Sequence, residues 1–137
     1  MKKFYIILIL EILFLYSCEE RERSNPFDPN ADPDAWAPSN LQAEVINDSQ
    51  IKLSWTQEVE QITGFRIEKK AGIGSFSQIA EVEKGVTEYT DTGLNYGTDY
   101  TYQVQAFTDL NASGYVEITV YIPQPTLTIT SPNGGET

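Results

Sequence analysis

The sequence predicts an all-β fold, a sandwich of two sheets, over residues 37–123. Apolar and polar side chains alternate through several short segments, which is the pattern of strands with one buried face. Turn-forming residues separate these segments about every 8 to 12 residues, a spacing that is typical of sandwiches. No long stretch has the period of a helix, so we expect the core to form between strands.

Three of these segments have a face that a core can bury. Residues 51–56 place Ile51, Leu53 and Trp55 on one face and polar side chains on the other. Residues 100–106 and 116–122 alternate in the same way. We therefore expect a core in which four side chains of these segments are buried: Trp55, Tyr102, Val104 and Ile118.

Five segments of the chain resemble, in order, strands A, B, C, E and F of a fibronectin type III domain: residues 37–41, 51–55, 64–68, 89–94 and 100–106. The resemblance covers residues 37–123 and implies a seven-stranded Greek-key sandwich of the immunoglobulin-like kind, without a disulfide. It implies that Trp55 fills the core. It also implies that Tyr100 is the tyrosine of the corner between strands E and F, whose hydroxyl returns to the backbone near Leu94.

Residues 1–17 have the features of a lipoprotein signal peptide. Two lysines precede an apolar run over residues 4–16, which is shorter than a bilayer span. Residues 15–18, Leu-Tyr-Ser-Cys, resemble a bacterial lipobox, which implies that Cys18 is acylated and becomes the mature N-terminus. Glu11 and Tyr16 depart from the usual pattern, and an uncleaved signal anchor or an ordinary secretory peptide is the alternative.

The sandwich has a predicted segment on either side. Residues 18–36 are acidic and rich in proline, so we expect an extended tether. Residues 28–34 space oxygen ligands as a calcium loop begins, but Pro33 and Ser39 occupy the positions that need Gly and Glu, and we expect no metal. Residues 124–137 are expected to be a linker and the first strand of a further, truncated immunoglobulin-like domain.

The composition excludes several classes of function. The chain has no His and a single Cys, so the usual groups of acid–base, thiol and transition-metal chemistry are missing. We expect no catalytic residues, no cofactor and no enzymatic activity. With 9 basic and 20 acidic residues, the chain also lacks the clustered cations that nucleic acid binding requires. The membrane is therefore expected as a partner only through a lipid on Cys18.

Three aromatic residues form the candidate binding surface. Phe107 and Tyr115 are expected to flank the hairpin between strands F and G on the face opposite the core, with Tyr121 further along. Exposed rings of this kind can bind a glycan or a protein partner. We favour the other interpretation, cross-strand packing, in which the rings stabilise the sheet and bind no ligand.

These features predict a non-catalytic, lipid-anchored protein of the bacterial cell envelope, at the outer membrane or cell surface rather than the inner membrane. Its module would serve as a spacer, or in adhesion by binding protein or glycan. The alternative is the N-terminal accessory region of a surface enzyme, for example a polysaccharide-degrading one, whose catalytic domain lies beyond residue 137.

Overall fold

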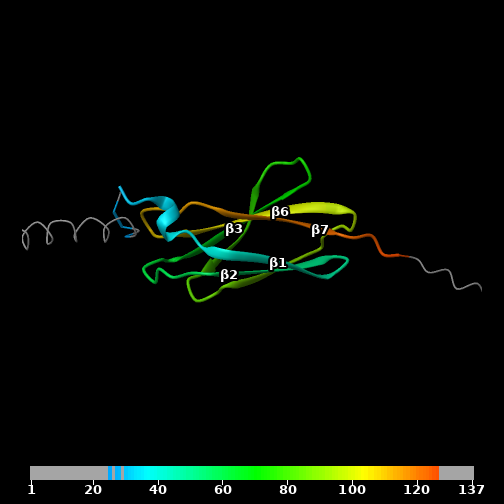
Figure 1. Cartoon of the computed structure of the whole chain (residues 1–137), viewed down its shortest axis with the longest axis horizontal. Coiled ribbons are helices and arrows are strands. Elements are labelled where there is room, and N and C mark those ends of the chain that lie inside the picture. The colour runs from blue at the N-terminus through cyan, green and yellow to red at the C-terminus, as the bar shows by residue number, and fades with distance from the viewer. Residues whose placement is uncertain (1–24, 26, 29, 127–137) are drawn as a thin grey trace, which may run out of the picture.

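The computed structural model describes residues 25, 27–28 and 30–126 and contains seven strands and a short 3-10 helix, η1 (Pro33–Trp36). The strands are β1 (Ser39–Asn47), β2 (Gln50–Thr56), β3 (Gly64–Ala71), β4 (Ser77–Glu83), β5 (Glu88–Thr92), β6 (Thr98–Phe107) and β7 (Val116–Ile122). They form an elongated sandwich in which the entering and leaving ends of the described chain lie far apart (Figure 1).

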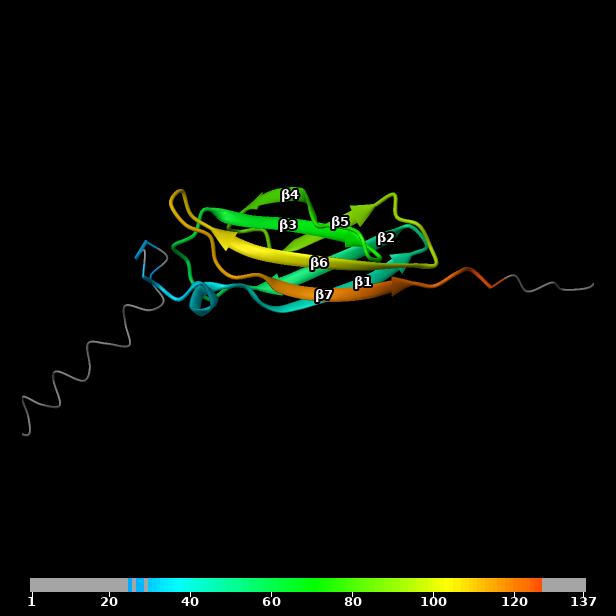
Figure 2. The same ribbon diagram turned by 90° about the horizontal axis from the view of Figure 1, so that it is seen from above.

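The two sheets of the sandwich are antiparallel throughout. One has the order β1-β2-β5 and the other the order β4-β3-β6-β7. Figure 2 shows the second sheet with its long central strands β3 and β6 beside one another. The prediction of a seven-stranded, all-β sandwich is thus confirmed.

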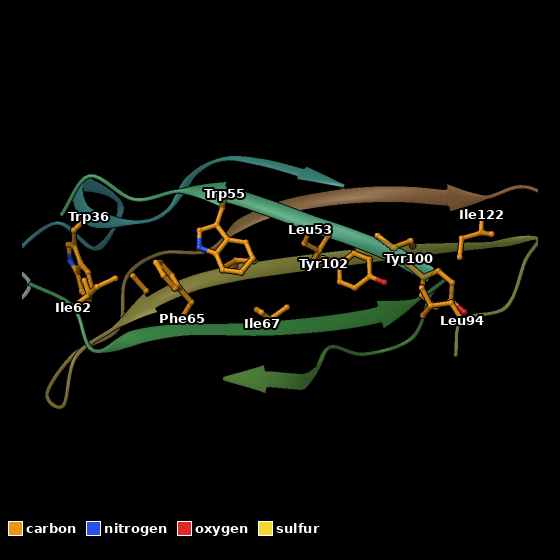
Figure 3. Close-up of a cluster of buried hydrophobic side chains, with 13 residues drawn as sticks. Trp36, Leu53, Trp55, Ile62, Phe65, Ile67, Leu94, Tyr100, Tyr102 and Ile122 are labelled. Carbon is orange, nitrogen blue, oxygen red and sulfur yellow. The ribbon is translucent and has the colours of Figure 1, made fainter. Parts of the chain in front are cut away.

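The core lies between the inner faces of the two sheets (Figure 3). Ile51, Leu53 and Trp55 of β2 are buried, as their alternation predicts. The indole of Trp55 packs edge-on against Phe65 of β3, with the ring centres 5.3 Å apart. This contact joins the two sheets, and edge-to-face aromatic pairs of this kind add about 0.5–1.5 kcal/mol to the burial of their area.

The expected burial is confirmed for three side chains and wrong for the fourth. Trp55, Tyr102 and Val104 are almost or completely buried, whereas Ile118 is only partly buried. Ile118 lies on β7, which among the described strands is the last of its sheet and pairs with β6 alone. An edge strand has no neighbour on one side, so the inner face of β7 is only partly covered, although it contacts β1.

The sandwich begins earlier than the boundary predicted at residue 37. Trp36, which we assigned to the tether, is 2% exposed and belongs to the core. It is the last residue of η1, whose first turn is set by Pro33 and by Asp32, which accepts a hydrogen bond from the amide of Asp34. Residues 18–24 lie outside the described residues, so the tether itself stays a prediction.

The corner between β5 and β6 has the geometry that the resemblance implies. The hydroxyl of Tyr100 accepts a hydrogen bond of 2.9 Å from the amide of Asn95, next to Leu94. Gly97 has a φ of 71°, a left-handed conformation that glycine adopts without steric cost. This confirms the predicted corner and the structural role of Tyr100.

A buried polar cluster also connects the sheets. Asp91 of β5 accepts hydrogen bonds from Lys69 Nζ at 2.7 Å and from the hydroxyl of Tyr102 at 2.8 Å. Burial, followed by the neighbouring Asp91 carboxylate, raises the pKa of Tyr102 far above its ordinary value. The phenol therefore remains a hydrogen-bond donor throughout the physiological range, and the sheets are held by a donor from β3 and another from β6.

We predict that Trp55→Ala lowers the free energy of unfolding by about 3–5 kcal/mol, because it removes a buried ring and leaves a cavity between the sheets. Urea unfolding followed by circular dichroism measures the change. Tyr121→Ala is the matched control, since this ring is 51% exposed and its loss should change stability by about 0.5 kcal/mol at most. Equal stability of the two variants would contradict the core described above.

Candidate functional site

The outer face of the four-stranded sheet carries the three aromatic residues singled out from the sequence. Tyr115 directly precedes β7 and is 45% exposed, and Tyr121 near the end of β7 is also exposed. Phe107, at the end of β6, is only 7% exposed, so the prediction that it forms part of an exposed surface was wrong. Two of the three rings are therefore available to a partner.

Phe107 is buried because side chains of β3 and β4 cover its ring on the outer face of the sheet. The guanidinium of Arg66 lies 4.2 Å from the centre of the Phe107 ring, a distance typical of a cation–π contact. Arg66 is held there by Glu81, whose carboxylate accepts a hydrogen bond of 3.0 Å from Arg66 Nε. The ring thus lies beneath an ion pair that bridges β3 and β4.

Gly64 provides the space that this arrangement needs. It pairs with Phe107 across β3 and β6. A Cβ atom at Gly64 would lie 2.2 Å from the carbonyl oxygen of Val82 and 3.1 Å from Cε1 of Phe107. No residue with a side chain fits here without a backbone shift, so the absence of a side chain allows both β4 and the ring of Phe107 to approach β3.

Tyr115 belongs to a polar network across β3, β6 and the start of β7. Its hydroxyl accepts a hydrogen bond of 2.8 Å from Gln105 Nε2 and donates one of 3.3 Å to Glu68 Oε1. The other carboxylate oxygen of Glu68 accepts a hydrogen bond from Gln103 Nε2. Desolvation and the nearby Glu68 carboxylate raise the pKa of Tyr115, so the phenol stays protonated at neutral pH.

The exposed rings do not form a continuous platform. Tyr115 and Tyr121 are six residues apart along one strand direction, which corresponds to about 20 Å. Glu117 and Thr119 occupy the positions between them on the same face of β7. The geometry therefore favours the packing alternative: Phe107 packs under Arg66, Tyr115 is fixed by hydrogen bonds, and Tyr121 stands apart.

The network partners of these rings were not identified from the sequence. Arg66, Glu68 and Gln105 alternate with core residues on β3 and β6, so their outward direction was predictable. Which outward residues meet depends on the register between β3 and β6, since Arg66 pairs with Gln105 and Glu68 with Gln103. A single sequence does not contain that register.

The sequence also raised the possibility of a lipidation site, a calcium loop and a membrane segment. Cys18 lies outside the described residues. Within the described part of the chain, no three His, Cys, Asp or Glu side chains gather as metal ligands, and Asp28 and Asp32 accept backbone amides of Asn30 and Asp34 in local turns. Over residues 25, 27–28 and 30–126, no helix is long and apolar enough to cross a membrane.

Comparisons with known proteins identify related sequences. The model of the fibronectin type III domain family matches residues 36–119. An alpha-amylase of Niallia circulans is 39% identical over 101 residues, which are 68% of this chain and 7% of that protein. Exoglucanase B of Cellulomonas fimi is 32% identical over 110 residues, 76% of this chain and 9% of that protein. The chain thus matches less than a tenth of the length of either relative.

Solved structures share the fold at lower identity. The fn3 domain of the human collagen alpha-1(XX) chain superposes with a TM-score of 0.62 at 20% identity, covering 79% of this chain and 100% of that one. The chicken CNTN1 FN1–FN3 domains give a TM-score of 0.59 at 20% identity and cover 64% of this chain and 32% of that one. At this level of identity the similarity concerns the fold alone.

We predict that Phe107→Ser destabilises the sandwich by about 1.5–3 kcal/mol, because the substitution removes an apolar ring that is buried beneath Arg66. Tyr115→Phe is the matched comparison on the same face. It removes only a hydroxyl whose partners can turn to water, so the expected cost is about 1 kcal/mol or less. Thermal and urea unfolding of both variants measure this order, and a larger loss for Tyr115→Phe would show that the polar network dominates.

Proposed function

Because this chain belongs to the fibronectin type III domain family, we propose that its sandwich is a non-catalytic spacer in a larger bacterial protein that acts on polysaccharide. A fibronectin type III domain is itself a non-catalytic module, so the chemistry of such a protein would belong to another domain. The observation that carries the proposal is that the described chain enters and leaves the sandwich at opposite ends of its long axis (Figures 1 and 2).

Because the chain enters at one end of the sandwich and leaves at the other, the domain separates the segments that precede and follow it by its own length. The chain enters through η1, crosses the full length of the sandwich and leaves after Ile122 at the end of β7. The longest strand, β6, has ten residues, which correspond to about 33 Å. Whatever precedes the domain is therefore held about that distance from whatever follows it.

The entry is fixed by contacts of the incoming segment. The carbonyl of Pro33 accepts a hydrogen bond of 3.1 Å from the amide of Gly114, in the loop before β7. The carbonyl of Trp36 accepts another, of 3.2 Å, from Gln57 Nε2, in the loop after β2. Together with the burial of the Trp36 ring, these hydrogen bonds hold η1 against the sandwich. The chain therefore enters the domain in a defined direction, which supports a role as a spacer.

The polysaccharide assignment depends on the relatives. Both are proteins with names of glycan-degrading enzymes, an alpha-amylase and an exoglucanase, and this domain corresponds to a small part of each. A module that two enzymes with different names share is expected to contribute position rather than chemistry. We therefore place the present domain as the N-terminal accessory region of such a protein, in preference to a module whose own surface binds protein or glycan.

The anchor is the second part of the proposal. We propose that a lipid on Cys18 attaches the protein to the bacterial cell envelope, at the outer membrane or cell surface, and that the acidic segment from Glu19 lifts the sandwich off the bilayer. The acidic net charge supports a covalent anchor, because an acidic chain is repelled by anionic lipid. Stable attachment then requires two or more acyl chains.

We predict that removing residues 36–123 brings the C-terminal end of the chain closer to the membrane by about 30 Å. Energy transfer between a membrane dye and a fluorophore at Thr137 measures the distance on intact cells. Replacement by an unrelated sandwich of equal length should restore both the distance and the action on surface polysaccharide. If the distance returns and the action does not, the domain does more than space.

We predict that Cys18→Ser abolishes incorporation of a clickable fatty acid and leaves export intact, because the thiol is the proposed acylation site. Ser17→Ala is the matched control, since it keeps a small residue before the cysteine, and it should remain labelled. Absence of label from the wild type as well would mean that residues 1–17 act as an ordinary secretory peptide or a signal anchor.

A further inference from the structure

The end of the sandwich from which the chain leaves carries an open apolar groove. The groove has a volume of about 380 Å³, larger than the cavity of about 150 Å³ that holds a benzene molecule in an engineered protein. It lies between the end of β1 and the segment that follows β7. Its lining includes Val45, Asn47, Asp48, Ile122, Pro123 and Pro125.

Further apolar side chains surround this end. Ile73 in the turn after β3, Tyr96 in the turn before β6, and Tyr121 are all more than half exposed. They belong to the same end of the sandwich, because the amide of Gly72 donates a hydrogen bond of 2.9 Å to the carbonyl of Asp99, the residue that pairs with Tyr121. These three side chains leave apolar groups exposed at the same end of the sandwich as the groove.

The opposite end of the sandwich shows how this protein covers such a surface. There η1 packs against the sandwich, and the side chain of its last residue, Trp36, is only 2% exposed. The fit is close, because a Cβ atom at Gly114 would lie 1.9 Å from Oδ1 of Asp34. Among the described residues, the groove at the exit has no equivalent cover.

The chain leaves along a fixed path beside the groove. The amide of Gly97 donates a hydrogen bond of 2.7 Å to the carbonyl of Ile122, and the Gln124 side chain lies over Gly97. Pro123 and Pro125 restrict the backbone of the next residues. Residues 127–137 lie outside the described residues, but they follow Thr126, which lines the groove, so the chain itself supplies a covalently linked segment beside it.

We infer that this segment covers the groove through Leu127 and Ile129, and so fixes the angle at which the following part of the protein is attached. The two residues are two apart, so in an extended segment their side chains lie on one side, with Thr128 and Thr130 on the other. Aliphatic side chains match a groove lined by Val45 and Ile122. The inference rests on the proposed spacer role and deepens it: the spacer sets direction as well as length.

Hydrogen exchange of the full chain, followed by NMR, tests the inference. The amides of Gly97 and Leu94 report on this end, since they donate to Ile122 and Ser49. In Leu127→Ser with Ile129→Ser, we expect their exchange to accelerate at least about tenfold, through easier local opening. Exchange of the core amide of Val104 should stay unchanged. The matched control, Thr128→Ser with Thr130→Ser, alters the other side of the segment and should leave all three exchange rates as in the wild type.

The order of residues 127–130 gives a second measurement. Backbone order parameters near 0.85 are expected in the wild type and below about 0.6 in the Leu127/Ile129 double variant. Unchanged exchange in that variant, or an equal change in the threonine control, would overturn the inference. Protection that depends on protein concentration would also overturn it, because a second copy would then be the occupant.

These outcomes are separable from those of the spacer proposal. If energy transfer shows the expected spacing while Gly97 exchanges equally in all variants, the sandwich is a spacer with a free joint and the inference alone fails. If the spacing itself is absent, the proposed function fails, whatever the exchange rates are.

Discussion

Burial of one face of each sheet against the other is the constraint on which the rest of this structure depends. Successive residues of a strand point to opposite sides, so a slip of one residue would turn the inner face of β2 toward solvent. The contact of Trp55 with Phe65 holds the sheets together near one end. Further along the sandwich, Asp91 accepts hydrogen bonds from Lys69 and Tyr102 of the other sheet. Burial of the apolar side chains between the sheets supplies most of the stability. The polar cluster fixes the position of one sheet relative to the other, because a shift of Asp91 would leave its buried carboxylate without the hydrogen bonds from Lys69 and Tyr102.

The same alternation leaves the outer face of the larger sheet free to vary, and here it is used for packing. Phe107 points outward, yet Arg66 covers it and Gly64 allows it to lie close to β3. An aromatic residue on the solvent face of a sheet is therefore not by itself a binding site. Its neighbours across the strands decide whether the ring is available. The polar groups around Tyr115 bond mainly to one another, so they stabilise this face of the sandwich.

The fold could be predicted from the sequence to a large extent, because the period of two and the turn signals are local features. The Tyr100 corner was predictable for the same reason, since its partner lies five residues away. The burial of Phe107 and Trp36 could not be predicted from the sequence. Phe107 is covered by a residue 41 positions earlier in the chain, and Trp36 lies in a segment whose proline and charge content predicts a tether. Both depend on long-range contacts, which composition and spacing do not contain. The partial exposure of Ile118 has a related cause, the order of strands within the sheet.

The two ends of the sandwich differ in a way that bears on what such a module can do. A spacer with free joints transmits distance only, because each joint lets the next element sample many directions. At the entry, Trp36 and the hydrogen bonds of Pro33 with Gly114 remove that freedom. Ordering a segment costs conformational entropy, so such a contact is retained only where it buries enough surface to offset that cost. If the protein acts on polysaccharide as proposed, a defined direction at both joints would orient the domain that carries out that action. Under the proposed function, the exit groove would therefore decide whether the module sets distance alone or sets both distance and direction.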